Sequence, residues 1–113
     1  MCIISLFSLE YCMNWKKHSK WFLACGSFVN YCLEQAGIDG AGGKAYSYLN
    51  WGHKVTTPQY GAIVVFNESH VGFYVGMNGD NYIILHGNWS NMIEKSTYIK
   101  KSQLKEFRMP IGY

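Results

Sequence analysis

Residues 21–30 read WFLACGSFVN and begin an amphipathic pattern that continues to residue 36. Its apolar positions follow the i, i+3, i+4, i+7 spacing of a helix. They are Phe22, Cys25, Phe28, Val29, Cys32, Leu33 and Ala36. Gly37 follows, in the place where a glycine commonly ends a helix. The stretch therefore predicts a central helix with one face buried in the core.

The chain after this helix has the pattern of a short connection followed by strands. Residues 38–43 are glycine-rich, and residues 44–51 predict a short helix. The run Ala62–Phe66 has the length and composition of a buried strand. From residue 70 the side chains alternate, with His70, Gly72 and Tyr74 on one face and Val71 and Phe73 on the other. We expect an α+β domain with the helix packed on an antiparallel sheet of four to six strands.

Asn78-Gly79 marks a hairpin turn after the strand that His70 begins. A two-residue Asn78-Gly79 turn would pair His70 with Gly87. A three-residue loop over 77–79 with a bulge would pair His70 with His86 and put Asn88 diagonally from it on the same face. We predict the second register, since it brings His70, His86 and Asn88 together.

Cys25 and His70 have the local contexts of a nucleophile and its base. A cysteine in the first turn of a helix is close to unpaired N–H groups and the positive end of the helix dipole, which favour the thiolate. A histidine within reach can hold that thiolate and later protonate a leaving group. Core packing would equally explain a cysteine on an apolar stripe. The position at the helix start and the strand histidine favour the nucleophile.

The amino-acid composition narrows the classes of protein to which the chain can belong. The chain has 113 residues, enough for one domain, with 49% hydrophobic and 17% aromatic residues and a net charge of +3. Its lysines fall in two short stretches and do not predict a nucleic-acid surface. The four cysteines form no Cys-x-x-Cys pair that would indicate zinc. Cys25 and Cys32 are too far apart along one helix to bridge, and we interpret Cys32 as a small core residue.

The first 20 residues are the hardest to interpret. Residues 3–15 predict a helix over the core. The apolar start is short and has neither a preceding basic residue nor a following cleavage site, so we do not expect a signal peptide. No stretch is long enough for a membrane span. His18 and His53 lie in lysine-containing stretches and suggest no role.

From about residue 21 to residue 98 the chain resembles the NlpC-type papain-like cysteine peptidases, and it is similar to the related CHAP domains. The matching segments stand in the family's order. They are CGSFVN at 25–30, GAIVVF at 61–66, SHVGFYVG at 69–76 and ILHG at 84–87. The resemblance implies a papain-like domain over 21–113, with residues 1–20 as a poorly matched N-terminal segment.

The resemblance also implies site residues and a substrate. Cys25 would be the nucleophile, His70 the base and His86 the orienting group, with Asn88 as the alternative third member. The expected activity is amide cleavage in a peptidoglycan stem peptide, without a metal or organic cofactor, as in a phage lysin or an exported wall enzyme. The oligomeric state and the compartment are not indicated.

Two departures from the family pattern leave other functions open. Relatives often have Pro-Trp or Asp-Cys-Ser directly around the nucleophile, where this chain has Leu23-Ala24-Cys25-Gly26, and Ala62 stands in place of the acidic residue of their Pro-Gly-Asp turn. An inactive domain of the same fold that binds the wall is one alternative. An acyltransferase or deamidase acting on another amide is the other.

Overall fold

The computed structural model describes residues 25–57, 59–67, 70–87, 93–99 and 103–113. The expected helix over residues 3–15, His18 and Asn88 lie outside these ranges. The described elements are α2 (Cys25–Gln35), the 3₁₀ helix η2 (Ala45–Asn50), β1 (His53–Val55), β2 (Ile63–Phe66), β3 (Val71–Asn78), β4 (Asn81–Gly87), β5 (Ile93–Ile99) and β6 (Leu104–Met109).

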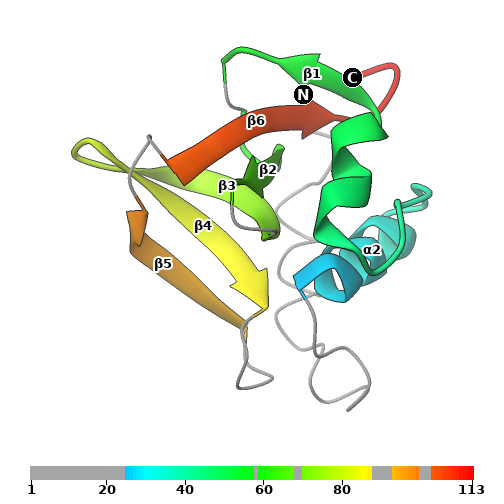
Figure 1. The fold of residues 1–113 in the computed structure, drawn as a ribbon, viewed down its shortest axis with the longest axis horizontal. Helices are drawn as coiled ribbons and strands as arrows, with labels where there is room; N and C mark the ends of the chain where they lie inside the picture. The colour runs from blue at the N-terminus through cyan, green and yellow to red at the C-terminus, as the bar shows by residue number, and fades with distance from the viewer. Residues whose placement is uncertain (1–24, 58, 68–69, 88–92, 100–102) are drawn as a thin grey trace.

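The strands form a six-stranded sheet in the order β1-β6-β2-β3-β4-β5. Every neighbouring pair is antiparallel. Helix α2 packs against β3 and β4, and η2 packs against β2, β3 and β6 (Figure 1). The predicted α+β fold, a helix packed on an antiparallel sheet in the papain-like manner, is confirmed.

Helix α2 ends as its sequence predicts. Gly37 has a φ of 79°, in the left-handed region that glycine adopts without strain. The Gly37 N–H donates to the Glu34 carbonyl at 3.0 Å, and the Ile38 N–H donates to the Leu33 carbonyl at 2.9 Å. These two bonds form a Schellman motif, which satisfies carbonyls that the helix end would otherwise leave open.

The main core lies between α2, η2 and one face of the sheet. Phe28 of α2 packs edge-on against Phe73 of β3, with ring centroids 6.0 Å apart. Leu33, Tyr48 and Leu85 are in the same buried cluster. The helical spacing therefore predicted the buried face of α2 correctly. The side chains on this face contact every second residue of a strand, since alternate strand residues point to the same side of the sheet.

Cys32 is fully buried in this core, as predicted, but it is also disulfide-bonded. The interpretation of Cys32 as a plain core residue was therefore incomplete. A disulfide needs a second sulfur close in space, and residue spacing alone does not reveal which cysteine meets that condition.

The glycine-rich connection runs along α2 and is fixed to it by polar contacts. The Gly42 N–H donates to Asn30 Oδ1 at 3.1 Å, and the Tyr48 hydroxyl donates to the Gly42 carbonyl at 3.2 Å. A Cβ on Gly26 would lie 2.3 Å from the Gly43 carbonyl oxygen. The connection therefore approaches the start of α2 so closely that only glycine fits at position 26.

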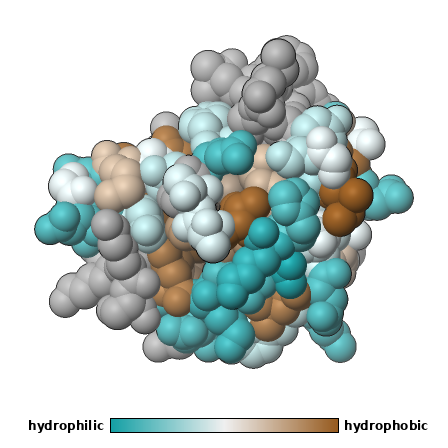
Figure 2. All heavy atoms as spheres, turned by 90° about the horizontal axis from the view of Figure 1, so that it is seen from above, coloured by the Kyte–Doolittle hydropathy of each residue, from teal (hydrophilic) through white to brown (hydrophobic). Residues whose placement is uncertain are grey.

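The second face of the sheet has a smaller cluster. Val64, Phe66, Ile84 and Phe107 are buried there. The rings of Tyr74, Tyr82 and Phe107 contact one another edge-on, with centroids 5.5–6.1 Å apart. Seen from above the view of Figure 1, the surface is a mixture of hydrophilic and apolar side chains (Figure 2). In the ranges that the structure describes, no helix is long and apolar enough to cross a membrane.

Candidate active site

His70 immediately precedes β3 and is held by two contacts with Phe66. The Phe66 N–H donates to the His70 carbonyl at 2.9 Å, which fixes the backbone. The two rings lie at 35° to each other with centroids 5.4 Å apart. Phe66 thus restricts the imidazole on one side. The sequence had not suggested this role, because its pattern indicated only that Phe66 belongs to a buried strand.

His86 lies on β4 and is 5% exposed. Its Nδ1 is 2.9 Å from His70 Nε2, and the two rings meet edge-on with centroids 4.7 Å apart. One of the two nitrogens donates and the other accepts, so a single proton lies between the rings. The structure thus brings together two of the four predicted site residues.

The register that produces this contact differs from both predicted registers. Asn78 pairs with Asn81, so the turn consists of Gly79 and Asp80, one residue later than expected. Gly79 takes the first turn position with a φ of 61°, which both common two-residue hairpin turns require. The register also shifts between Tyr74 and Gly76, which makes Val75 the extra residue of a bulge.

The later turn and the bulge together keep His86 on the same face of the sheet as His70. Beyond the bulge Phe73 pairs with Leu85, which places Gly72 across from His86 and His70 diagonally from it. The expected shared face is therefore correct, whereas the expected direct pairing was wrong. A shift of two positions conserves the face of every side chain, because the side-chain period of a strand is two.

Gly72 provides the space that His86 occupies. A Cβ at Gly72 would lie 2.7 Å from Ile84 Cγ2 and 3.0 Å from His86 Cβ. Two side chains and one backbone carbonyl of β4 therefore occupy the space beside Gly72.

The environment of His70 favours the neutral imidazole. Burial, and secondarily the neighbouring His86, lower the pKa of His70 from 6.5 to about 4. A neutral ring near pH 7 has one nitrogen with a free lone pair, as a general base requires. With Nε2 engaged by His86, the nitrogen left for another partner is Nδ1.

Cys25 is the first residue of α2. Its side chain is outside what the structure describes, so the sulfur-to-nitrogen distance to His70 stays a prediction. Phe28, three residues later, contacts Phe73, which is three residues after His70. The start of α2 therefore packs on β3 at the face of Phe73, whereas Gly72, across from His86, takes the other face. Asn88, the alternative third member, lies outside the described residues, and His53 is on β1 at an edge of the sheet.

We expect the free energy of unfolding to decrease as the pH is lowered from about 6.5 toward about 4. In this window His70 takes up a proton in the unfolded chain but not in the folded one, so acid favours unfolding. His70→Gln should flatten this pH dependence in urea denaturation, whereas His53→Gln, the control, should not. Equal slopes for both variants and the wild type would contradict the buried, neutral state of His70.

A comparison of the sequence with models of protein families finds a match. The model of the CHAP domain matches residues 14–88, which is 75 of the 113 residues. The match includes α2, the glycine-rich connection and the strands that carry both histidines. No curated protein matches the chain.

Proposed function

The chain belongs to the CHAP domain family, and from this premise we propose that it hydrolyses an amide bond in the stem peptide of peptidoglycan. The family implies an amidase or peptidase that acts on peptidoglycan, and its members are typically cysteine-dependent amidohydrolases. In our proposal Cys25 is the nucleophile, His70 the base and His86 the group that orients the base.

The observation that carries the proposal is the bond between His70 Nε2 and His86 Nδ1. When Nε2 donates its proton to His86, Nδ1 of His70 keeps its lone pair and can accept the Cys25 proton. The lowered pKa of His70 makes the neutral imidazole the main species near pH 7, and in our proposal the bond to His86 selects this tautomer. The orienting group of a catalytic triad acts in the same way, by fixing the tautomer and the ring position of the base.

The proposed reaction is acyl transfer in two steps. The Cys25 thiolate, favoured by the N-terminal end of α2, attacks the amide carbonyl carbon, and backbone N–H groups at the helix start stabilise the oxyanion. The C–N bond breaks as His70 protonates the departing amine, which leaves a thioester on Cys25. Water that loses a proton to His70 then attacks the thioester, releasing the carboxylate product and the thiol.

We also propose that the protein acts outside a reducing cytosol, either exported or delivered by a phage. The disulfide at Cys32 supports this location, because disulfides persist in oxidising compartments. Peptidoglycan lies in the same compartments, so the location and the substrate agree.

Ala62 supports a second candidate, a domain that binds the wall without cutting it. Ala62 is fully buried, and its carbonyl accepts the Tyr74 N–H at 2.8 Å. An apolar residue therefore occupies the turn in which relatives often carry an acid. Such a domain would keep the fold and lose turnover.

Incubation of the wild-type protein with purified peptidoglycan distinguishes the two candidates. Hydrolysis should release new amino groups at a rate proportional to protein concentration, and mass spectrometry of the fragments should identify the amide that is cut. Protein that sediments with the wall but releases no amino groups would favour the binding domain. Protein that does neither would contradict both.

A further inference from the structure

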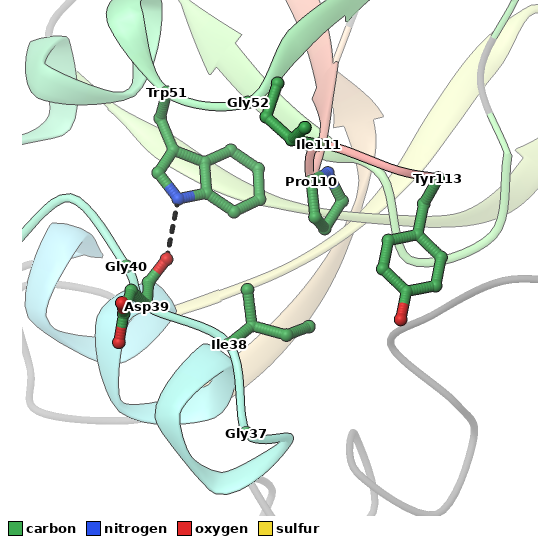
Figure 3. Close-up of a pocket in the computed structure, with 9 residues that line it drawn as sticks. All are labelled: Gly37, Ile38, Asp39, Gly40, Trp51, Gly52, Pro110, Ile111 and Tyr113. Atoms are coloured by element: carbon green, nitrogen blue, oxygen red, sulfur yellow. Dashed lines mark hydrogen bonds between the residues drawn. The ribbon is translucent and has the colours of Figure 1, made fainter.

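The cavity at the far end of α2 is not part of the surroundings of the histidine pair. It lies between the end of α2, residues 51–52 and residues 110–113 (Figure 3). Neither His70 nor His86 lines it. The environment of His70 is therefore determined by its neighbours on the sheet, and Phe66 is a neighbour to which the proposed reaction assigns no part.

Phe66 lies directly across from His70. The register between β2 and β3 includes the pair Val65 and Val71. The bond from the Phe66 N–H to the His70 carbonyl extends this register by one position. Residues that face each other in an antiparallel pair have their side chains on the same side of the sheet, about 5 Å apart at Cβ. The position of the Phe66 ring beside the imidazole is therefore a consequence of strand pairing.

Phe66 is also held from the side away from His70. It is 4% exposed and belongs to the smaller buried cluster of the sheet. Between β2 and β6 the register skips Lys105, whose side chain is exposed, so this residue is the extra one of a bulge. The bulge leaves Leu104 opposite Phe66, and Leu104 packs against the same cluster. Phe66 therefore has little freedom to move away from the imidazole.

Phe66 and His86 contact the imidazole of His70 in different ways. The Phe66 ring lies at 35° to the imidazole with centroids 5.4 Å apart, which is a tilted stack. His86 meets the imidazole edge-on at 88° and contacts its Nε2. Rotation of the imidazole about its Cβ–Cγ bond would disturb both contacts. Together they fix one plane for the ring and direct Nε2 to His86.

Phe66 contributes to the burial that keeps His70 neutral. Burial is the larger cause of the low pKa of His70, and the neighbouring His86 is the smaller one. The ion pair of Glu106 and Arg108 on β6 lies across from main-core residues of β2, on the opposite face of the sheet. A large apolar ring beside the imidazole therefore affects its protonation through desolvation.

We propose that Phe66 is a positioning residue for His70, since its ring fixes the imidazole in the plane in which Nε2 meets His86. The inference rests on the proposed function, because His70 is the base of that reaction. Phe66 acts through His70, so its removal changes the state of the base and can be observed without turnover.

Proton–nitrogen NMR spectra of the imidazoles in the full chain, recorded over a range of pH, test the proposal. Phe66→Met keeps a flexible apolar side chain and removes the flat ring. His70→Gln identifies the His70 signals by their loss. In Phe66→Met the pKa of His70 should rise from about 4 toward 6.5, by about half a pH unit or more. The nitrogen shifts should also indicate a mixture of the two neutral tautomers.

A second variant and a matched control separate positioning from general packing. Phe66→Leu, which also lacks the ring, should shift the His70 signals in the same direction. Phe107→Met is the control, since Phe107 belongs to the same buried cluster and its ring contacts Tyr74 and Tyr82. It should lower the free energy of unfolding and leave the His70 signals unchanged. Unchanged His70 signals in both Phe66 variants, or an equal shift in Phe107→Met, would overturn the proposal.

Hydrolysis of purified peptidoglycan gives a second readout. Phe66→Met should lower kcat about three- to tenfold with KM nearly unchanged, because a displaced base affects the chemical step more than binding. A rise in KM with unchanged kcat would show an effect on the substrate and overturn the positioning role. Wild-type protein that releases no amino groups would contradict the proposed function, whereas the NMR titration would still decide the role of Phe66.

Discussion

Cys25→Ala is expected to abolish hydrolysis of peptidoglycan, with a loss of more than about 10³-fold, while the domain stays folded. Alanine keeps the helix and removes the atom that would form the thioester. The measurement is the release of amino groups from purified wall, with circular dichroism to confirm the fold. Folded Cys25→Ala protein that still cuts the wall would exclude the proposed nucleophile.

His70→Ala should produce nearly the same loss, and the double variant should be no worse than either single one. Groups that act as a unit give strongly non-additive losses, because removing one already disables the other. His53→Ala is the matched control, since His53 is on β1 and far along the sheet order from β3 and β4. Independent, additive losses would argue against a Cys25–His70 pair.

Thiol labelling gives a readout of the same pair that does not need a substrate. Iodoacetamide should modify Cys25 near neutral pH, because the thiolate is the reacting form. Cys32 should stay unmodified without a reductant, since its sulfur is in a disulfide. His70→Ala should slow the labelling of Cys25, which mass spectrometry can follow by peptide.

His86→Ala is the second substitution with a large expected effect, a loss of about 10²-fold or more in kcat. It removes the partner of His70 Nε2 and opens space beside the ring. The acidic limb of the pH–activity profile should also move to higher pH. Burial and His86 both lower the pKa of His70, so without His86 this pKa should rise toward its ordinary value.

Further variants separate the orienting role from simple packing. His86→Asn retains an acceptor and should recover part of the activity that alanine loses. Gly72→Ala would put a methyl group 2.7 Å from Ile84 Cγ2, 2.8 Å from the Leu85 carbonyl oxygen and 3.0 Å from His86 Cβ. It should therefore displace β4 together with His86 and lower both kcat and stability. We expect Asn88→Ala to cost less than His86→Ala, and the reverse order would make Asn88 the third member.

The sequence predicted α2, β2 and β3 because each has a clear local pattern, whereas it indicated no range for β1, β5 or β6. The stripe from Phe28 to Leu33 and the alternation around Phe73 are both determined by which side chains face the core. The glycine at position 37 predicted the end of α2, since the left-handed conformation there favours glycine. The fold class followed from these elements, because a helix and strands that each have one apolar face must pack together.

The register of the hairpin could not be predicted in the same way. Asn78-Gly79 and Gly79-Asp80 are both acceptable turn pairs, and the choice between them depends on which side chains the whole sheet buries. The bulge at Val75 has no signal of its own in the sequence apart from the adjacent Gly76. The contact between the two histidines was still anticipated, since turn and bulge together moved the pairing by an even number of positions.

The disulfide at Cys32 has a consequence for how the proposed enzyme matures. Cys25 must be a free thiol to attack an amide, yet Cys32, two turns further along the same helix, is oxidised. An oxidant that forms the disulfide at Cys32 also acts on Cys25 in the same chain. A Cys25 that pairs with another cysteine loses the thiol that the proposed reaction needs. Cys32 is fully buried, so the folded core keeps its sulfur from exchanging with an outside thiol. In the proposed enzyme, disulfide formation therefore has to use Cys32 and spare Cys25, so that one sulfur of the helix serves structure and the other stays a thiol.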